Sequence, residues 1–121
     1  MPDIIKMIND PAGYQPEMLA RKLELENWTR DRGLAIAEAE GITMTKEHWQ
    51  VVDFLRDYYI RCGMAPAGRV LAAALDEVFA AHGGVPYLHT LFPKGPVAQA
   101  SRIGGLPLPP YTEDRSFGSA M

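Results

Sequence analysis

Few side chains in this sequence could carry out covalent chemistry, and their spacing excludes several kinds of site. Cys62 is the only cysteine among the 121 residues, so these residues hold neither a disulfide framework nor a thiolate metal cluster. Cys62 falls at the expected C-terminal end of a helix, whereas activated cysteines favour the N-terminal end. The sequence therefore predicts a packing role for this thiol, with a redox role as the alternative.

The histidines and carboxylates form no catalytic or metal-binding pattern. The three histidines are His48, His82 and His89, and no two of them stand four residues apart, the spacing that places two imidazoles on one helix face. The acidic residues are scattered, and the sequence places no pair of them together for acid–base catalysis. We therefore expect no bound metal and no cofactor.

The composition is that of one globular domain with a small acidic excess. Hydrophobic residues make up 47% and charged residues 22% of the chain, and the net charge is −3. A net negative charge argues against indiscriminate binding to nucleic-acid phosphates. No segment reaches the roughly 18 consecutive apolar residues of a membrane span, and the N-terminus lacks a signal-peptide pattern. We expect a cytoplasmic protein with no membrane contact.

The pattern of apolar residues predicts a mainly α-helical bundle. Caps, glycines and prolines divide the chain into expected helices at residues 16–26, 28–40, 46–61, about 66–82, 86–92 and 96–103. Residues 3–16 are predicted to form a small β-hairpin, because a β-branched run precedes turn-forming residues at positions 9–13.

The same spacing predicts which helix faces are buried. In the helix at 28–40 the expected inner face is formed by Trp28, Ala35 and Ala39. The expected inner face of the helix at 46–61 contains Trp49, Val51, Val52, Leu55, Tyr58 and Tyr59. The expected inner face of the helix after Pro66 contains Val70, Leu71, Ala74, Leu75, Val78 and Phe79.

The helices before and after residues 62–65 resemble a helix-turn-helix, a joint with structural and DNA-binding uses. A DNA-reading helix presents Arg, Lys, Asn or Gln to bases and phosphates. The second helix here presents Arg69, but then Asp76 and Glu77. Because these carboxylates repel phosphates, the sequence favours ordinary helix packing over DNA binding.

Residues 105–121 are predicted to form an extended C-terminal arm. The helix at 96–103 stops at Gly104-Gly105, and the segment Pro107-Leu108-Pro109-Pro110 favours a stiff polyproline II conformation. Stiffness lowers the entropy that such an arm loses on entering a partner's cleft.

From Trp28 to about residue 110 the chain resembles the DsrC/TusE family of sulfur-relay proteins. That family includes the gamma subunit of dissimilatory sulfite reductase and a carrier in tRNA 2-thiouridine synthesis. The resemblance lies in Glu40-Gly41-Ile42, Thr45, Glu47-His48-Trp49, Val52, Phe54, Arg56, Tyr58-Tyr59, Ala65-Pro66, Arg69-Val70-Leu71, Tyr87-Leu88, Leu91-Phe92-Pro93-Lys94-Gly95-Pro96 and Gly105-Leu106-Pro107.

The resemblance implies an orthogonal helical bundle with a small hairpin near its N-terminus. It implies one domain over residues 1–121, in which residues 1–27 are the variable part and residues 105–121 are the arm. Family members carry sulfur on an arm cysteine next to the last residue, and the DsrC type has a second cysteine eleven positions upstream. The corresponding positions here are Ser101 and Thr112.

A hydroxyl group neither forms a stable persulfide nor exchanges with disulfides, as a thiolate does. We therefore expect a protein that is not an enzyme and that regulates or scaffolds sulfur metabolism by docking to a sulfur-relay or sulfite-reductase-type partner. The residues expected to support docking are Arg69, Lys94, Arg102, Gly105, Leu106 and Pro107. The alternatives are a DNA-binding regulator of sulfur genes and a sulfur carrier that uses Cys62.

Overall fold

The computed structural model describes residues 16–112, and these residues form helices and loops without a strand. The mainly helical prediction is confirmed, while the hairpin predicted for residues 3–16 lies outside the described residues except for its last position. The elements in chain order are α2 (Pro16–Glu24), α3 (Arg30–Ala39), α4 (Lys46–Cys62), α5 (Gly68–Val78), the 3₁₀ helix η1 (Ala80–His82), α6 (Gly84–Leu91) and α7 (Pro96–Ile103).

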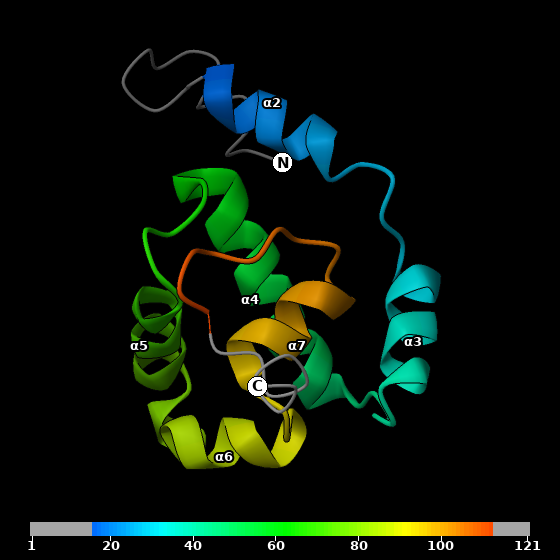
Figure 1. The fold of residues 1–121 in the computed structure, drawn as a ribbon, viewed down its shortest axis with the longest axis vertical. Coiled ribbons are helices and arrows are strands. Elements are labelled where there is room, and N and C mark those ends of the chain that lie inside the picture. The colour runs from blue at the N-terminus through cyan, green and yellow to red at the C-terminus, as the bar shows by residue number, and fades with distance from the viewer. Residues whose placement is uncertain (1–15, 113–121) are drawn as a thin grey trace.

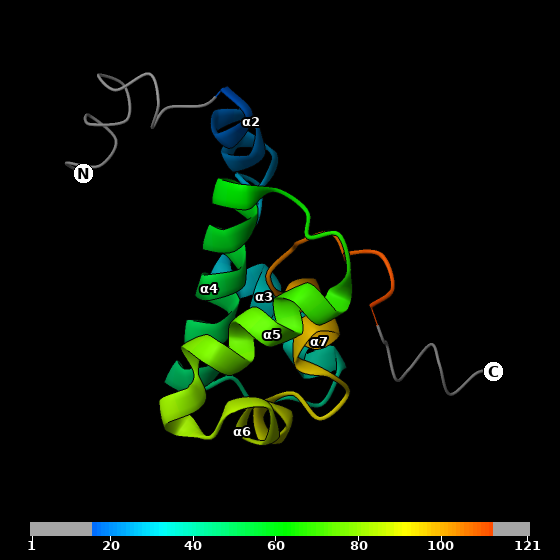
Figure 2. The ribbon, with the colours of Figure 1, turned by 90° about the vertical axis from the view of Figure 1, so that its left-hand side faces the viewer.

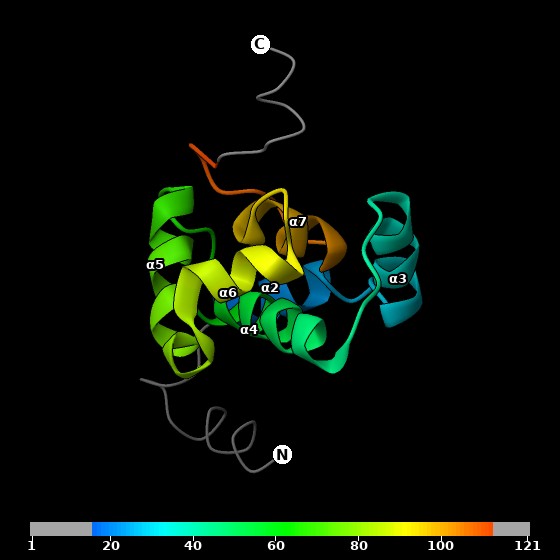
Figure 3. The same ribbon diagram turned by 90° about the horizontal axis from the view of Figure 1, so that it is seen from below.

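The short helix α7 is the centre of the bundle. It contacts α3, α4, α5 and α6, and every residue from Pro96 to Ser101 is buried, as is Ile103. Figures 1 and 3 show α5 and α3 on opposite sides of the stacked α4 and α7. The apolar face of α4 that meets α7 contains the buried residues Val51, Val52 and Leu55. The protein therefore builds its core around the helix from which the arm departs.

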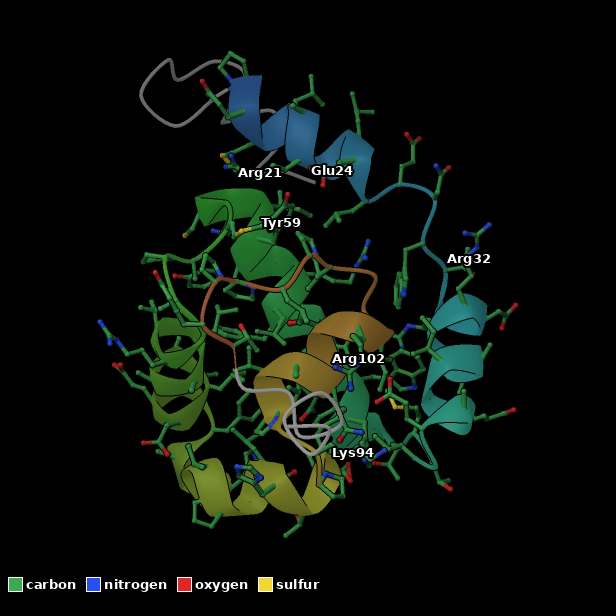
Figure 4. All side chains as sticks on the ribbon, viewed as in Figure 1. Arg21, Glu24, Arg32, Tyr59, Lys94 and Arg102 are labelled. Atoms are coloured by element: carbon green, nitrogen blue, oxygen red, sulfur yellow. The ribbon has the colours of Figure 1, made fainter. Side chains whose placement is uncertain are left out.

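Helix α2 lies apart from this core, against the C-terminal end of α4 (Figure 2). It contains no buried residue, so it contributes no side chain of its own to the buried core. Polar contacts fix it: Arg21 of α2 reaches the end of α4, and the Tyr59 hydroxyl donates to the Glu24 carboxylate at 2.9 Å. Figure 4 shows these three side chains together between the two helices.

Trp28 packs against the core as expected, but the other two residues of the predicted inner face of α3 were wrong. Ala35 and Ala39 are exposed, whereas Gly33 and Ala37 are buried. The cause is the closeness of α3 to α7: a Cβ atom at Gly33 would lie 3.0 Å from the Ile103 carbonyl oxygen and 3.0 Å from the Trp28 ring. A count of apolar side chains overlooks a glycine, although only a glycine allows this approach.

The predicted inner face of α5 holds except at its end. Leu71, Leu75 and Phe79 are buried, but Val78 is 53% exposed. Helix α5 ends at Val78, and Phe79 is its C-cap residue. Phe79 continues the row of Leu71 and Leu75, since its N–H still donates to the Leu75 carbonyl at 2.9 Å, and Val78 lies on the solvent side of that row.

His48 is a buried structural residue that closes the N-terminus of α4. Its Nδ1 accepts hydrogen bonds from the Thr45 backbone N–H at 3.1 Å and from the Thr45 hydroxyl at 2.7 Å. This assignment leaves the Nε2–H group to donate to the Leu91 carbonyl at 2.9 Å. The imidazole also packs edge-on against Phe92, so His48 links the start of α4 to the end of α6.

Candidate functional site

Cys62 is the last residue of α4 and a free, exposed thiol. Gly63 follows with φ of 78° and donates its N–H to the Tyr59 carbonyl at 2.8 Å, which ends the helix. Met64 comes next and is 49% exposed. The predicted packing role is therefore wrong, because the turn that ends α4 leaves the thiol on the surface.

An arginine from another helix donates hydrogen bonds to the backbone carbonyls that precede Cys62. Arg21 of α2 donates to the carbonyl oxygens of Ile60 at 3.0 Å and Arg61 at 3.2 Å. Carbonyls at a helix C-terminus lack partners within the helix and carry partial negative charge, so the guanidinium neutralises this end of α4. Sequence reasoning missed Arg21, because the contact joins residues 39 positions apart.

The arm leaves α7 through a tightly held exit. The Trp28 Nε1–H group donates to the Ile103 carbonyl at 2.7 Å, and Arg56 donates to the Gly104 carbonyl. The Arg56 guanidinium also lies over the Trp28 ring, 4.1 Å from its centroid, and its burial lowers the pKa of Arg56. Gly105 has φ of 68°. Trp28 and Arg56 therefore fix the direction of the arm.

From this exit the arm crosses the turn that follows Cys62 and reaches the N-terminus of α5 (Figures 1 and 2). Pro107 and Pro109 share a small hollow with Gly63 and Met64. At the far end the Gly68 N–H group donates to the Pro110 carbonyl at 2.9 Å. The arm thus passes the turn that directly follows the exposed thiol.

Ser101 and Thr112, the two positions that the sequence resemblance aligns with arm cysteines, have different surroundings. Ser101 is 1% exposed and lies beneath the arm residues Leu106 and Pro107. Thr112 is partly exposed, and its hydroxyl donates to the Pro109 carbonyl at 2.6 Å. Its Cα and Oγ1 atoms lie against Gly68. Neither hydroxyl is a sulfur nucleophile.

The predicted docking residues are not all on one surface. Arg69 and Lys94 are exposed, and Leu106 packs partly against the core. Arg102 instead links α7 to the end of α3, because its guanidinium pairs with the Glu40 carboxylate at 2.8 Å. The hydrogen bond from Arg102 is the main cause that lowers the pKa of Glu40, against the opposing effect of burial. Figure 4 shows Arg102 and Lys94 near α7.

Residues 16–112 contain neither a candidate metal-binding cluster nor a membrane-spanning helix. No three His, Cys, Asp or Glu side chains in this part of the chain are grouped so that they could hold a metal ion. No helix in the same range is long and apolar enough to cross a membrane.

Comparison with known proteins gives consistent matches. The family model described as DsrC like protein matches residues 20–111. The proteins named sulfurtransferase TusE from Shigella dysenteriae serotype 1 (strain Sd197) and Escherichia coli (strain K12) are each 45% identical over 87 residues, which cover 71% of this chain and 80% of theirs.

Two solved structures share the fold. The NMR structure of Allochromatium vinosum DsrC matches with a TM-score of 0.61 and 40% identity, over 70% of this chain and 77% of that one. The crystal structure of the oxidized gamma-subunit of the dissimilatory sulfite reductase (DsrC) from Archaeoglobus fulgidus matches with a TM-score of 0.59 and 34% identity, over 73% and 82%. The resemblance noted from the sequence is confirmed.

The expectation that the chain is not an enzyme is overturned. Relatives at 45% identity are named sulfurtransferases. The expectation rested on the hydroxyl residues Ser101 and Thr112 and took Cys62 for a packed residue, whereas its thiol is exposed. The names of the relatives favour sulfur carriage over a non-catalytic scaffold. DNA binding through α4 and α5 stays a prediction that no finding supports.

Proposed function

The chain belongs to the DsrC family, and from this membership we propose that it is a sulfur carrier of the sulfurtransferase kind. It takes up sulfane sulfur on Cys62 as a persulfide and passes that sulfur to the thiol of a protein partner. The relatives named sulfurtransferase TusE support the activity. The exposed Cys62, which is the only cysteine in the sequence, supports the position.

The transfer is an exchange of one sulfur atom between thiols. The Cys62 thiolate attacks the outer sulfur of a donor persulfide, forms a new S–S bond and breaks the donor's S–S bond, so the donor leaves as a thiolate. In the second step an acceptor thiolate attacks the outer sulfur of the Cys62 persulfide, and Cys62 leaves as a thiolate. The two steps need no external oxidant or reductant, because one S–S bond replaces another each time.

Accessibility is the observation that carries the proposal. An incoming persulfide must reach the accepting sulfur directly, and Cys62 is exposed at the end of α4, two residues before the exposed Met64. The arm passes the same turn through Pro107 and Pro109. A partner that docks on the arm would therefore lie close to the thiol.

Partner docking is the second part of the proposal. Arg69 and Lys94 are exposed and, within residues 16–112, their side chains have no hydrogen-bond or ion-pair partner. The Lys94 charge helps to lower the pKa of Glu40, and both cations suit an acidic partner surface. Gly105, Leu106 and Pro107 set the course of the arm. Arg102 supports the arrangement from inside through Glu40.

Mass spectrometry tests sulfur uptake. The purified chain is incubated with a low-molecular-weight persulfide, and its intact mass is measured before and after treatment with a reductant. We expect a gain of one sulfur atom that the reductant removes. The Cys62→Ser variant, which keeps the size of an exposed side chain, should show no gain. A gain of equal extent in that variant, or none in the natural sequence, would contradict the proposal.

A further inference from the structure

A cavity of about 370 Å³ lies between α5, α6 and the start of α7, beneath the end of the arm. Its volume falls within the range of pockets that hold small molecules. Its inner part is apolar and is formed mainly by Ala72, Leu75, Val85, Leu88 and Val97. The three helices that form the walls pack on one another, so the cavity is formed by the folded bundle itself.

The polar part of the cavity is positive, although the chain as a whole is negative. The net charge is −3, yet among residues 16–112 those around the cavity include Arg69 and His89 and no Asp or Glu. Within residues 16–112, the Arg69 guanidinium has no hydrogen-bond or ion-pair partner. The nearby carboxylate of Asp76 is not part of the lining and accepts the Val85 N–H at 2.8 Å. An unpaired guanidinium beside an apolar surface attracts an anion.

The helix dipoles reinforce this charge. Gly68 and Arg69 are the first residues of α5, and Pro96 and Val97 are the first residues of α7, and all four line the cavity. Two helix N-termini therefore converge on one space. The Gly68 N–H donates to the Pro110 carbonyl and Pro96 has no N–H, so the amides that face a ligand are those of Arg69 and Val97. N–H groups in the first turn of a helix have no acceptor within that helix, and the positive end of the dipole favours bound anions.

We propose that this cavity binds a small molecule with an apolar body and one anionic end, such as a short aliphatic carboxylate. The anionic group lies against Arg69 and the two helix N-termini, and the hydrocarbon part contacts Ala72 and Val97. The site is separate from Cys62 and goes beyond sulfur carriage. Because Tyr111 and Thr112 belong to its rim, a bound ligand also contacts the end of the arm.

Titration with hexanoate, followed by the backbone amide signals of the full chain in NMR, tests this assignment. We expect saturable shifts centred on Ala72, His89, Val97 and Thr112, with a dissociation constant on the order of millimolar for so small a ligand. Hexan-1-ol and hexylammonium are the matched probes without the negative charge. Shifts of equal size with either probe would overturn the proposal.

Two variants locate the anion and the hydrocarbon. Arg69→Gln should weaken hexanoate binding about tenfold, since a charge-assisted hydrogen bond is lost. Arg32→Gln removes another exposed arginine, on α3, which lies on the opposite side of the molecule from α5 (Figures 1 and 4), and should change nothing. Ala72→Phe should fill the apolar part and abolish the shifts, while thermal unfolding verifies its fold. Unchanged binding in Arg69→Gln or in folded Ala72→Phe would refute the site.

Discussion

Glu40 shows how one carboxylate can hold two distant segments of this chain together. It follows α3, yet it accepts hydrogen bonds from Arg102 at 2.8 Å and from the Gln99 side chain at 2.9 Å, both on α7. These contacts stabilise the charged form of the carboxyl group, so the pKa of Glu40 lies below its ordinary value of 4.5. At the residue scale, the ion pair between Glu40 and Arg102 holds the end of α7, from which the arm departs.

The pairing predicts a pH-dependent stability. A carboxyl group whose pKa falls on folding stabilises the protein above its unfolded pKa, and this stabilisation is lost as pH falls through the folded pKa. Glu40→Gln should therefore lower the free energy of unfolding by about 1–2 kcal/mol at pH 7. Below pH 4.5 the difference between the two proteins should shrink. Urea unfolding at several pH values measures it, and a difference that does not vary with pH would contradict this role.

At the scale of elements, the exit of the arm depends on a glycine. Gly105 adopts φ of 68°, and a Cβ atom there would lie 2.7 Å from Cδ1 of the Trp28 ring. Gly105→Ala should lower the free energy of unfolding by about 2–4 kcal/mol, because backbone strain and displacement of the indole add together. Gly41 is a matched control, since it has φ of 78° but nothing within 4 Å of its Cβ position.

Gly41→Ala should cost only about 1–2 kcal/mol, which is the backbone strain alone. Urea unfolding of the two variants gives the comparison, and tryptophan fluorescence reports on Trp28. Equal losses of stability would mean that contact with the indole does not hold the arm exit.

The other end of the arm depends on Gly68. A Cβ atom at this residue would lie 2.8 Å from the Cα and Oγ1 atoms of Thr112, although an alanine suits the helix itself. Gly68→Ala should therefore displace the end of the arm and leave overall stability within about 1 kcal/mol. Hydrogen exchange at the amide of position 68, which donates to Pro110, should become faster. An amide that stays protected would show that the arm tolerates the methyl group.

The sequence predicts helices best where local chemistry defines their ends. Helix α7 spans Pro96–Ile103 as expected, because a proline begins it and glycines follow it. The predicted end of α4, at residue 61, lies one residue before the observed end at Cys62. The inner face of α3 was wrong because packing there follows Gly33, whose lack of a side chain leaves no apolar signal.

The candidate site was only partly predictable at the scale of the whole molecule. The resemblance located the arm and the positions Ser101 and Thr112, but the contacts that arrange the site join distant segments. Arg21 reaches the end of α4, and Arg56 reaches Gly104. Such contacts depend on how helices meet in three dimensions, which apolar spacing does not encode. The exposure of Cys62 follows from the same tertiary arrangement.

At the scale of the whole molecule, the arm passes the turn that follows the exposed Cys62, and the proposed relay requires sulfur to leave this thiol as well as to arrive. The direct measurement uses a cysteine desulfurase with radiolabelled cysteine, the full chain and an acceptor protein thiol. The label should appear on the chain, decline when acceptor is added and be absent from Cys62→Ser. Label that reaches the acceptor equally fast without this chain, or that stays on the Cys62→Ser variant, would contradict sulfur carriage by Cys62.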